Sequence, residues 1–220
     1  MVRSLVLSSF IALVLGACRG GIVVIEATIP DETGALTPLA GARLVFLPYD
    51  RDSVIQVLEN RAPSARPSGA RLDSLFDAFS APFNEYLRLS ASLARSTDSA
   101  ARRAIQDSVT RARGVLSATR DRLEPSIDSE RIRIRAWEDT AFRTYDSIGG
   151  LLVRQSYRDA IVDSTRSNGR VRIKLKRGVW YVTARAVNVR DPNREWYWNL
   201  RVEGDTVRLN PSTGRARPRL

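Results

Sequence analysis

The clearest pattern in the chain is a strict alternation of basic and apolar side chains after residue 169. The apolar positions are Val171, Ile173 and Leu175, and the basic positions are Arg170, Arg172, Lys174 and Lys176. A period of two is typical of a β-strand with one face in a core and the other in solvent. Asn168-Gly169 precedes the segment, and this pair favours two-residue hairpin turns in which both central residues have positive φ. We therefore predict a hairpin whose first strand is 160–164.

Similar short segments flank this hairpin on both sides. We expect further strands at 22–29, in 37–47, at 53–58, at 179–189, at 195–202 and at 206–209, with turns at 31–34, 48–52, 191–193 and 204–205. From Asn210 onward the chain is polar and basic, which predicts a frayed tail. Regular short strands separated by Gly, Asp and Asn turns are typical of a β-sandwich.

The hydrophobic period changes to that of a helix after a linker at 61–69, which is rich in proline and small residues. One apolar helix face is formed by Leu72, Leu75, Phe76, Phe79, Phe83, Tyr86, Leu87 and Leu93. A second seam, with alternating spacings of four and three, is formed by Ile105, Val109, Ala112, Leu116, Thr119 and Leu123. A third is formed by Ile134, Trp137, Ala141, Tyr145, Ile148 and Leu152. These seams predict two or three antiparallel helices packed on one another.

Local signals set the expected helix ends. Pro82 predicts a kink or a restart, and Thr97 is a candidate N-cap for the second helix. Pro125-Ser126 is expected to end that helix and begin another, and Gly149-Gly150 to weaken or break the last one. The aromatic residues on these faces are interpreted as helix core rather than as a ligand site. Spare apolar surface on the seams would allow pairing with a partner helix or self-association with a second copy.

Together these patterns predict an α+β fold, in which a small antiparallel β-sandwich of about seven strands carries an inserted helical hairpin or coiled coil. The expected division is a leader at 1–17, a split sandwich at 18–60 and 159–210, a helical insertion at 61–158 and a basic tail at 211–220.

The aromatic residues near the C-terminus divide between the two faces of their strands. Trp180, Trp196 and Trp198 fall on the predicted inward side, so we interpret them as core. Tyr197 falls on the other side and, with Arg201, is a candidate surface contact.

The N-terminus has the layout of an export signal. Arg3 is followed by an apolar run from residue 5 to residue 15 that is too short to span a bilayer, and then by small residues. Leu15-Gly16-Ala17-Cys18 resembles the lipobox of bacterial lipoproteins. That resemblance implies cleavage before Cys18 and its lipidation, and Arg19 in place of Asp is compatible with export to the outer membrane. The alternative is a plain secretory leader with an incidental cysteine.

A second resemblance covers residues 22–60 and 159–210. Pro38, Leu39, Gly41 and Ala42, with apolar Leu44 and Phe46, match a P-L-x-G-A element. Asn168, Gly169, Val171 and Ile173 match an N/D-G-x-[FV]-x-[FIL] element, and Gly178, Trp180 and Val182 match a G-x-Y-x-V element in which Trp replaces Tyr. In this order the elements resemble bacterial carboxypeptidase regulatory-like domains of the transthyretin-like sandwich type. The distance between them departs from the family and implies a large insertion.

Composition limits the chemistry. The chain has no histidine, and lipidation would consume its single cysteine, so the commonest proton shuttle and the usual zinc ligands are missing. No phosphate-binding loop, nucleophile elbow or calcium loop is visible. We therefore expect no catalytic residues, no metal site and no cofactor, although a carboxylate pair of the glycosidase type could assemble from distant positions.

Charge is unevenly distributed within the formal +11. Residues 18–60 carry a net −3, residues 61–169 a net +4 and residues 170–220 a net +9. This bias indicates an anionic partner or, as the simpler alternative, a genome-wide preference for arginine on solvated surfaces. The Arg170, Arg172, Lys174 and Lys176 face is the candidate site for anionic lipid headgroups or glycans. Export argues against a nucleic-acid partner.

The sequence thus favours a non-catalytic lipoprotein of the cell envelope, held by Cys18 at the periplasmic face of the outer membrane or at the cell surface. It would bind an envelope protein or polymer through its helices or its sandwich surface. The alternatives are a binder of anionic glycans or lipids and an enzyme, or enzyme subunit, that acts on envelope glycans.

Overall fold

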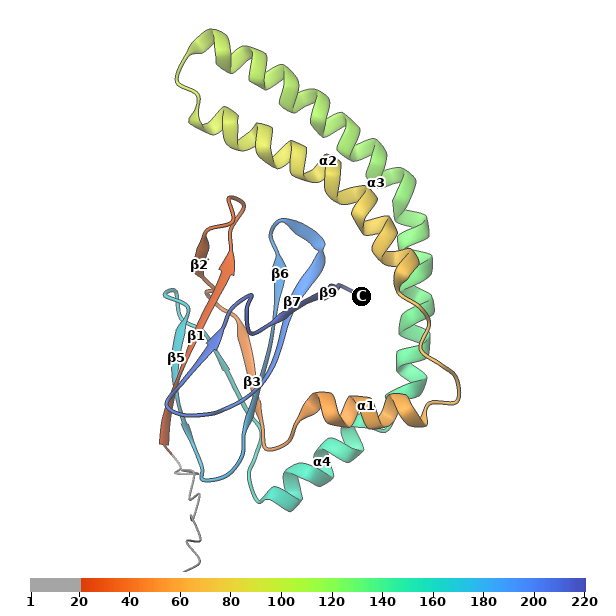
Figure 1. Ribbon diagram of the computed structural model, residues 1–220, viewed down its shortest axis with the longest axis vertical. Coiled ribbons are helices and arrows are strands. Elements are labelled where there is room, and N and C mark those ends of the chain that lie inside the picture. Colours follow the sequence, from red (N-terminus) through yellow and green to blue (C-terminus); the bar gives the residue numbers. More distant parts are fainter. Residues whose placement is uncertain (1–20) are drawn as a thin grey trace, which may run out of the picture.

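A computed structural model describes residues 21–220 and shows an α+β architecture (Figure 1). Cys18 and the leader lie outside the described residues. Within the described part, the strands are β1 (Gly21–Pro30), β2 (Leu36–Pro38), β3 (Arg43–Leu47), β4 (Ile161–Ser164), β5 (Arg170–Leu175), β6 (Tyr181–Asn188), β7 (Asp191–Arg201), β8 (Thr206–Leu209) and β9 (Arg215–Pro218). The helices are α1 (Arg51–Arg61), α2 (Ala70–Arg95), α3 (Ser99–Ala141) and α4 (Tyr145–Ser156). The predicted α+β class is confirmed.

The strands form two sheets. In the first, β1 pairs with β2, β5 and β8, and only the β1–β8 pair is parallel. The second has the order β4-β3-β6-β7-β9 and is antiparallel throughout. Both sheets contribute to one buried core, whose fully enclosed members include Ile25 and Leu209 from the first sheet and Phe46, Val182 and Trp198 from the second.

The alternation in β5 is as predicted. Val171, Ile173 and Leu175 are buried, whereas the intervening basic side chains are exposed. The predicted hairpin is wrong, however, because β4 pairs with β3 and β5 pairs with β1. The turn itself closes through Gly169 N, which donates to Arg166 O at 2.9 Å. Of the predicted turn pair, Asn168 and Gly169, only Gly169 has positive φ. It therefore sends the chain from one sheet to the other.

Thr165 joins segments that lie more than a hundred residues apart. Its hydroxyl donates to Leu39 O at 2.5 Å and accepts from Ala42 N at 2.9 Å, and its carbonyl accepts from Gly41 N at 2.9 Å. Thr165 is buried. These bonds hold the loop before β3 against the segment that follows β4.

The expected strand at 53–58 is wrong, since these residues lie in α1. Asp50 caps this helix by accepting from Asp52 N at 3.0 Å and from Ser53 Oγ at 2.7 Å. A side-chain cap satisfies backbone N–H groups that a helix start leaves free. That signal, with Leu58 buried on one face, outweighs the β-propensity of the neighbouring valine and isoleucine side chains.

The two longest helices differ from their expected limits. Both α2 and α3 continue through an internal proline, Pro82 and Pro125, so the predicted end at 125–126 is wrong. Figure 1 shows the pair curving together along its length. The N-cap of α3 is Asp98 rather than Thr97, because its carboxylate accepts from Ala101 N at 2.7 Å. The mutual packing of the two helices compensates for the backbone bond that each proline removes.

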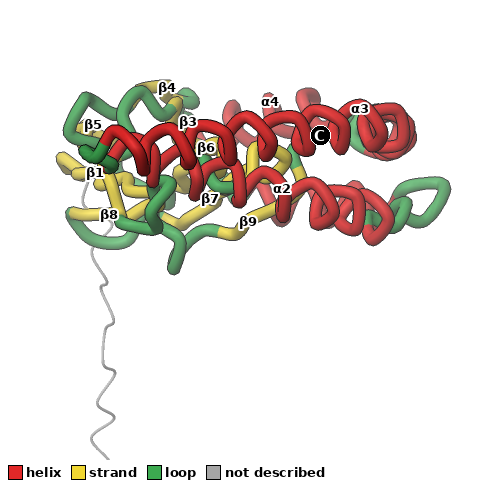
Figure 2. Tube along the Cα trace, turned by 90° about the horizontal axis from the view of Figure 1, so that it is seen from above, coloured by secondary structure: helices red, strands yellow, loops and turns green. Residues whose placement is uncertain are grey.

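The hairpin of α2 and α3 (residues 70–141), called the arm below, is packed firmly only near its base. There Leu72, Phe76, Ile127 and Ile134 form a second buried cluster. Between residues 81 and 120, all of which the structure describes, no side chain is buried. Figure 2 shows from above that the two helices run side by side and that their outer turns pass over the sheets.

The C-terminal segment is not a frayed tail. β9 pairs with β7, Arg219 N donates to Asn193 O at 2.8 Å, and Arg131 Nε of α3 donates to Arg219 O at 3.2 Å. Leu220 packs against the cluster at the base of the arm. This segment therefore links the second sheet to the arm. The turn before β7 lies at 189–190, two residues earlier than predicted, and β7 already begins at Asp191.

Among the helices of residues 21–220, none combines the length and the apolar character needed to cross a bilayer.

Gly169 offers a test of the junction between the sheets. A Cβ atom added there would lie 2.5 Å from Ala27 O, in addition to the strain of φ +71°. Gly204 has the same φ, but a Cβ there would meet nothing within 4 Å. We expect Gly169→Ala to lower the free energy of unfolding by at least about 2 kcal/mol and Gly204→Ala by about 1 kcal/mol. Urea unfolding of both variants measures the difference, and equal losses would contradict the close contact.

Candidate functional site

A cleft of about 790 Å³ lies between the base of the arm and the second sheet. Side chains from α1, the 61–69 linker, the base of the arm, β6, β7 and β9 line it. Figure 1 shows why these elements meet, since the helices arch from α1 and α4 around the side of the sheet that carries β9.

Tyr197 lies behind one end of the cleft, in contact with the lining residues Arg51, Asp52 and Arg217. It was predicted to face solvent, but only 2% of its surface is exposed. The prediction fails because the outer face of β7 is covered by α1 and β9. The Tyr197 hydroxyl donates to Asp52 Oδ1 at 2.6 Å and accepts from Arg51 Nη1 at 3.2 Å. Burial and the bond to Asp52 raise the pKa of this phenol above its ordinary value.

Arginines surround the Tyr197 ring. The guanidinium carbons of Arg217, Arg215 and Arg51 lie 4.0, 4.9 and 5.9 Å from its centroid, within the range of cation–π contacts. Two of these arginines have carboxylate partners. Arg217 Nη2 lies 2.8 Å from Glu195 Oε1, and Arg215 Nη2 lies 3.0 Å from Asp52 Oδ2. Burial lowers the pKa of Arg217, so closeness to Glu195 is needed to offset its loss of hydration.

Arg51 differs from its neighbours in its partners. Its guanidinium carbon lies 5.4 Å from the centroid of Tyr145 and 5.9 Å from that of Tyr197. Within residues 21–220, no carboxylate oxygen lies within 4.0 Å of its nitrogens. Its one hydrogen bond to the described part of the chain is the bond to Tyr197. The stacked guanidinium therefore keeps donors that its own surroundings do not use.

The predicted break at Gly149-Gly150 is wrong, because α4 runs through both glycines. Gly149 instead makes room for the contact between Tyr145 and Arg51. A Cβ atom on Gly149 would lie 2.6 Å from the Tyr49 hydroxyl. That hydroxyl lies 3.2 Å from the hydroxyl of Tyr145, and burial raises the pKa of Tyr49. The break between α3 and α4 falls instead at residues 142–144. Gly149 thus lets α4 approach α1 and bring Tyr145 to Arg51.

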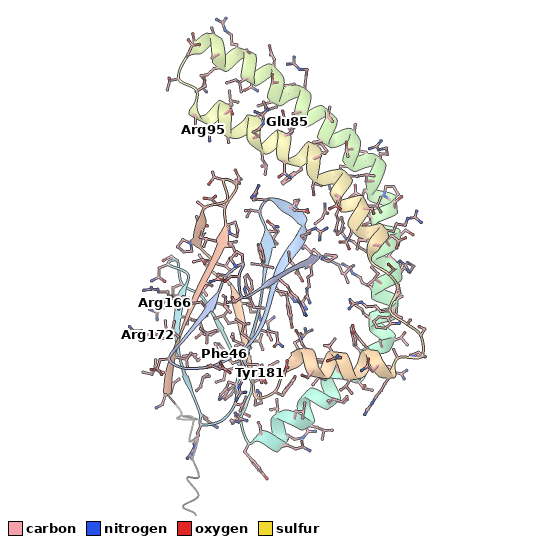
Figure 3. The ribbon with its side chains drawn as sticks, in the orientation of Figure 1. Phe46, Glu85, Arg95, Arg166, Arg172 and Tyr181 are labelled. Carbon is pink, nitrogen blue, oxygen red and sulfur yellow. The ribbon has the colours of Figure 1, made fainter. Side chains whose placement is uncertain are left out.

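The predicted basic face lies on the opposite side of the molecule. Figure 3 shows Arg166 and Arg172 at the sheet edge farthest from the helices. Arg170, Arg172 and Lys174 are exposed on β5, and Lys176 follows its end. A depression of about 290 Å³ is formed there by Arg166, Asn168, Arg170 and Arg172 with Val24 and Val171. The sequence therefore identified the contiguous basic face of β5, but it did not identify the cleft.

Part of the positive charge on this face is neutralised. Arg170 Nη2 lies 2.7 Å from Glu26 Oε1, and Arg208 Nε lies 3.3 Å from Glu26 Oε2. Because β5 is paired on one side only, basic side chains also discourage edge-to-edge pairing with another sheet.

The other predicted aromatic and surface residues fall into two groups, one in the core and one on the surface. Trp180 and Trp198 are buried in the core and Trp196 packs against it, as predicted. Arg201 is exposed, 3.7 Å from Glu203, and does not join buried Tyr197 in one surface site. Within the part of the chain that the structure describes, no group of three Cys, Asp or Glu side chains is placed to hold a metal ion.

No family model, curated protein or solved structure matches the chain.

Sequence reasoning missed Arg51, Arg215 and Arg217 because it assigned their segments to a turn and a tail. Two signals were present. Asp50 before a three-residue polar start is a helix cap, and Arg215, Ala216 and Arg217 alternate like the strand they form. The contact between these segments depends on long-range pairing, which the local pattern does not encode.

The raised pKa of Tyr197 predicts a pH dependence of stability. The unfolded phenol ionises near pH 10, whereas the folded state keeps the proton. The stabilisation is therefore complete below about pH 10 and is lost as pH rises through the folded pKa. We expect the stability advantage of wild type over Tyr197→Phe to shrink above about pH 10 in urea unfolding. Tyr157→Phe, at a side chain that is 90% exposed, is the control. Parallel curves for wild type and Tyr197→Phe would contradict the coupling.

Proposed function

We propose that the protein is a lipid-anchored, non-catalytic binding protein of the cell envelope, and that the outer half of its arm is the surface that contacts a partner. The observation that carries this proposal is the arm between residues 81 and 120, a long hairpin that extends past the ends of the strands without burying any side chain (Figure 1). A helix of the length of α3 spans about 65 Å. Such an extension adds little to the core of the fold but a large surface for contacts.

The chemistry of this surface favours an acidic partner with apolar side chains. Phe79 and Phe83 stack at 5.8 Å and, with Leu116, line a groove of about 490 Å³ between the two helices and the start of β7. Residues 83–122 carry eight arginines and four carboxylates. Like charge opposes self-association through this surface, although apolar pairing with a second copy would be detected by the same experiment.

The position of the anchor is compatible with this role. Cys18 lies three residues before Gly21, the first residue of β1, so lipid on Cys18 would hold that end within about 10 Å of a bilayer. Figure 1 shows the start of β1 and the α2–α3 connection at opposite ends of the longest axis. An anchored molecule would thus carry the tip of its arm away from the membrane.

A transthyretin-like sandwich of the carboxypeptidase regulatory-like type is the fold we propose for the two sheets. Its support is that the resembling elements meet in space. A Cβ on Gly169 would lie 3.1 Å from Leu39 N and 3.1 Å from Pro38 Cβ, although these residues are far apart in the sequence. The helices all lie between β3 and β4, as a single insertion would require.

Binding of anionic lipid headgroups or glycans is a second candidate function, and the depression between Arg166, Arg170 and Arg172 favours it. An enzyme acting on envelope glycans is less well supported. Glu195 and Asp52 are the carboxylates beside Tyr197, and each is bound to an arginine rather than facing the other across free space. A glycosidase-type pair would need two carboxylates that are free to act as acid and base.

Contacts of the arm are tested by photo-crosslinking in cells. A photoreactive residue at Leu116 is expected to give a discrete adduct with an envelope component, whereas one at Val162, which is 55% exposed on edge strand β4, is not. The adduct should disappear when Phe83 is changed to Glu, because the charge removes the apolar contact. An adduct with a second copy would assign the surface to self-association. No adduct at Leu116, or equal adducts at both sites, would contradict the proposal that the arm is the binding surface.

The anchor is tested by fractionation of cells. Cys18→Ser is expected to shift most of the protein out of the lipid-modified membrane fraction and to abolish incorporation of labelled fatty acid. Arg19→Asp should leave the lipid attached, since it keeps the cysteine. Continued fatty-acid labelling of Cys18→Ser would refute lipidation at this residue.

A further inference from the structure

We propose that the cleft binds an oxyanion, a carboxylate or phosphate group carried by a small ligand or by the end of a polymer, and that Arg51 is the residue that grips it. This site is distinct from the outer half of the arm and from the basic face of β5, so it stands or falls independently of the function proposed above.

The first argument is the balance of charge around Tyr197. Four arginines line this end of the cleft, Arg51, Arg185, Arg215 and Arg217, and two carboxylates, Asp52 and Glu195, face them. The local surplus is therefore two positive charges. In a cleft walled by protein such a surplus raises the local concentration of anions.

The rest of the lining carries the opposite charge, since three carboxylates, Glu59, Glu138 and Asp73, stand against one arginine, Arg66. Arg66 lies 2.8 Å from Glu59 and 2.6 Å from Glu138. Asp73 lies 3.2 Å from Arg194 on β7. The lining is therefore polarised. Arg51 and Glu59 lie eight residues apart on α1, about 12 Å along the helix, and an anionic group would be drawn to the Arg51 end.

The second argument is the state of Arg51. Tyr145 and Tyr197 fix its guanidinium by stacking, and its bond to the Tyr197 hydroxyl fixes one nitrogen. A guanidinium held in place loses little conformational freedom when it binds, and its planar donors match the geometry of a carboxylate or phosphate. Arg215 and Arg217 are committed to carboxylates, whereas Arg51 has no such partner within residues 21–220.

The third argument is space. A cleft of about 790 Å³ accepts a ligand of the size of one or two sugar units, and pockets at the junction of two structural units are common binding sites. Ile55, Phe142 and Pro218 add apolar surface beside the charged end. An acidic saccharide or a phosphorylated group would place its oxyanion on Arg51 and its less polar face on these side chains.

Binding is measured by isothermal titration calorimetry of the purified full chain in detergent, with sodium phosphate and sodium glucuronate as the two probes. We expect at least one probe to bind, with an affinity that falls as salt is raised. Arg51→Gln should weaken this binding at least tenfold, since it removes a charge-assisted hydrogen bond, and it leaves no described carboxylate without its partner. Phosphate binding alone would assign a phosphate group, and glucuronate binding alone a carboxylate.

The matched control is Arg88→Gln, which removes an exposed arginine paired with Glu85 on the outer part of the arm. It should change the affinity by less than twofold. Circular dichroism during heating shows whether Arg51→Gln is folded. If it is not, Arg51→Lys keeps the charge and should weaken binding severalfold by losing the planar fork. Failure of both probes to bind wild type, or unchanged binding by a folded Arg51 variant, would overturn the proposal.

Discussion

The fold depends on bringing together two strands that the sequence separates by a large helical insertion. The chain leaves the second sheet after β3 and returns to it at β4, and Phe46 pairs with Ile161 at the junction. Closing a loop of roughly 110 residues costs about 4 kcal/mol of chain entropy. The β3–β4 pairing and the bonds of Thr165 to Leu39, Gly41 and Ala42 offset this cost. Without them, the second sheet would lack its edge strand β4, and Ile161 would no longer cover the shared core.

The orientation of the helices depends on a second set of contacts, which is ionic and aromatic. α1 is tied to β7 through Arg51, Asp52 and Tyr197, and the base of α3 is tied to the C-terminal segment through Arg131. The Arg217–Glu195 ion pair lies beside these contacts. A buried ion pair adds little net stability, but it constrains the geometry, because separating the partners leaves a charge uncompensated. The same side chains that hold the arch in place therefore also shape the charged end of the cleft.

Much of the β core could be predicted from the sequence, because its strands carry their burial pattern locally. Val171, Ile173 and Leu175 alternate as the sheet requires, and Trp180 and Trp198 lie inside as their positions indicate. The cleft could not be predicted. Tyr197 obeys the same alternation, but whether its side of β7 is covered depends on α1 and β9, which come from distant parts of the chain. Pro125 was equally misleading, since packing against a second helix overrode a strong local signal.

The adjacency of the two ends of the insertion has a consequence for how such a chain can diverge. Leu47 and Ile161 lie at neighbouring positions in one sheet, so the helices between them begin and end at almost the same place on the scaffold. Whole turns could be added to or removed from the outer arm without altering strand register or the shared core. Selection on the reach and surface chemistry of the arm can therefore proceed almost independently of selection on the scaffold that carries it.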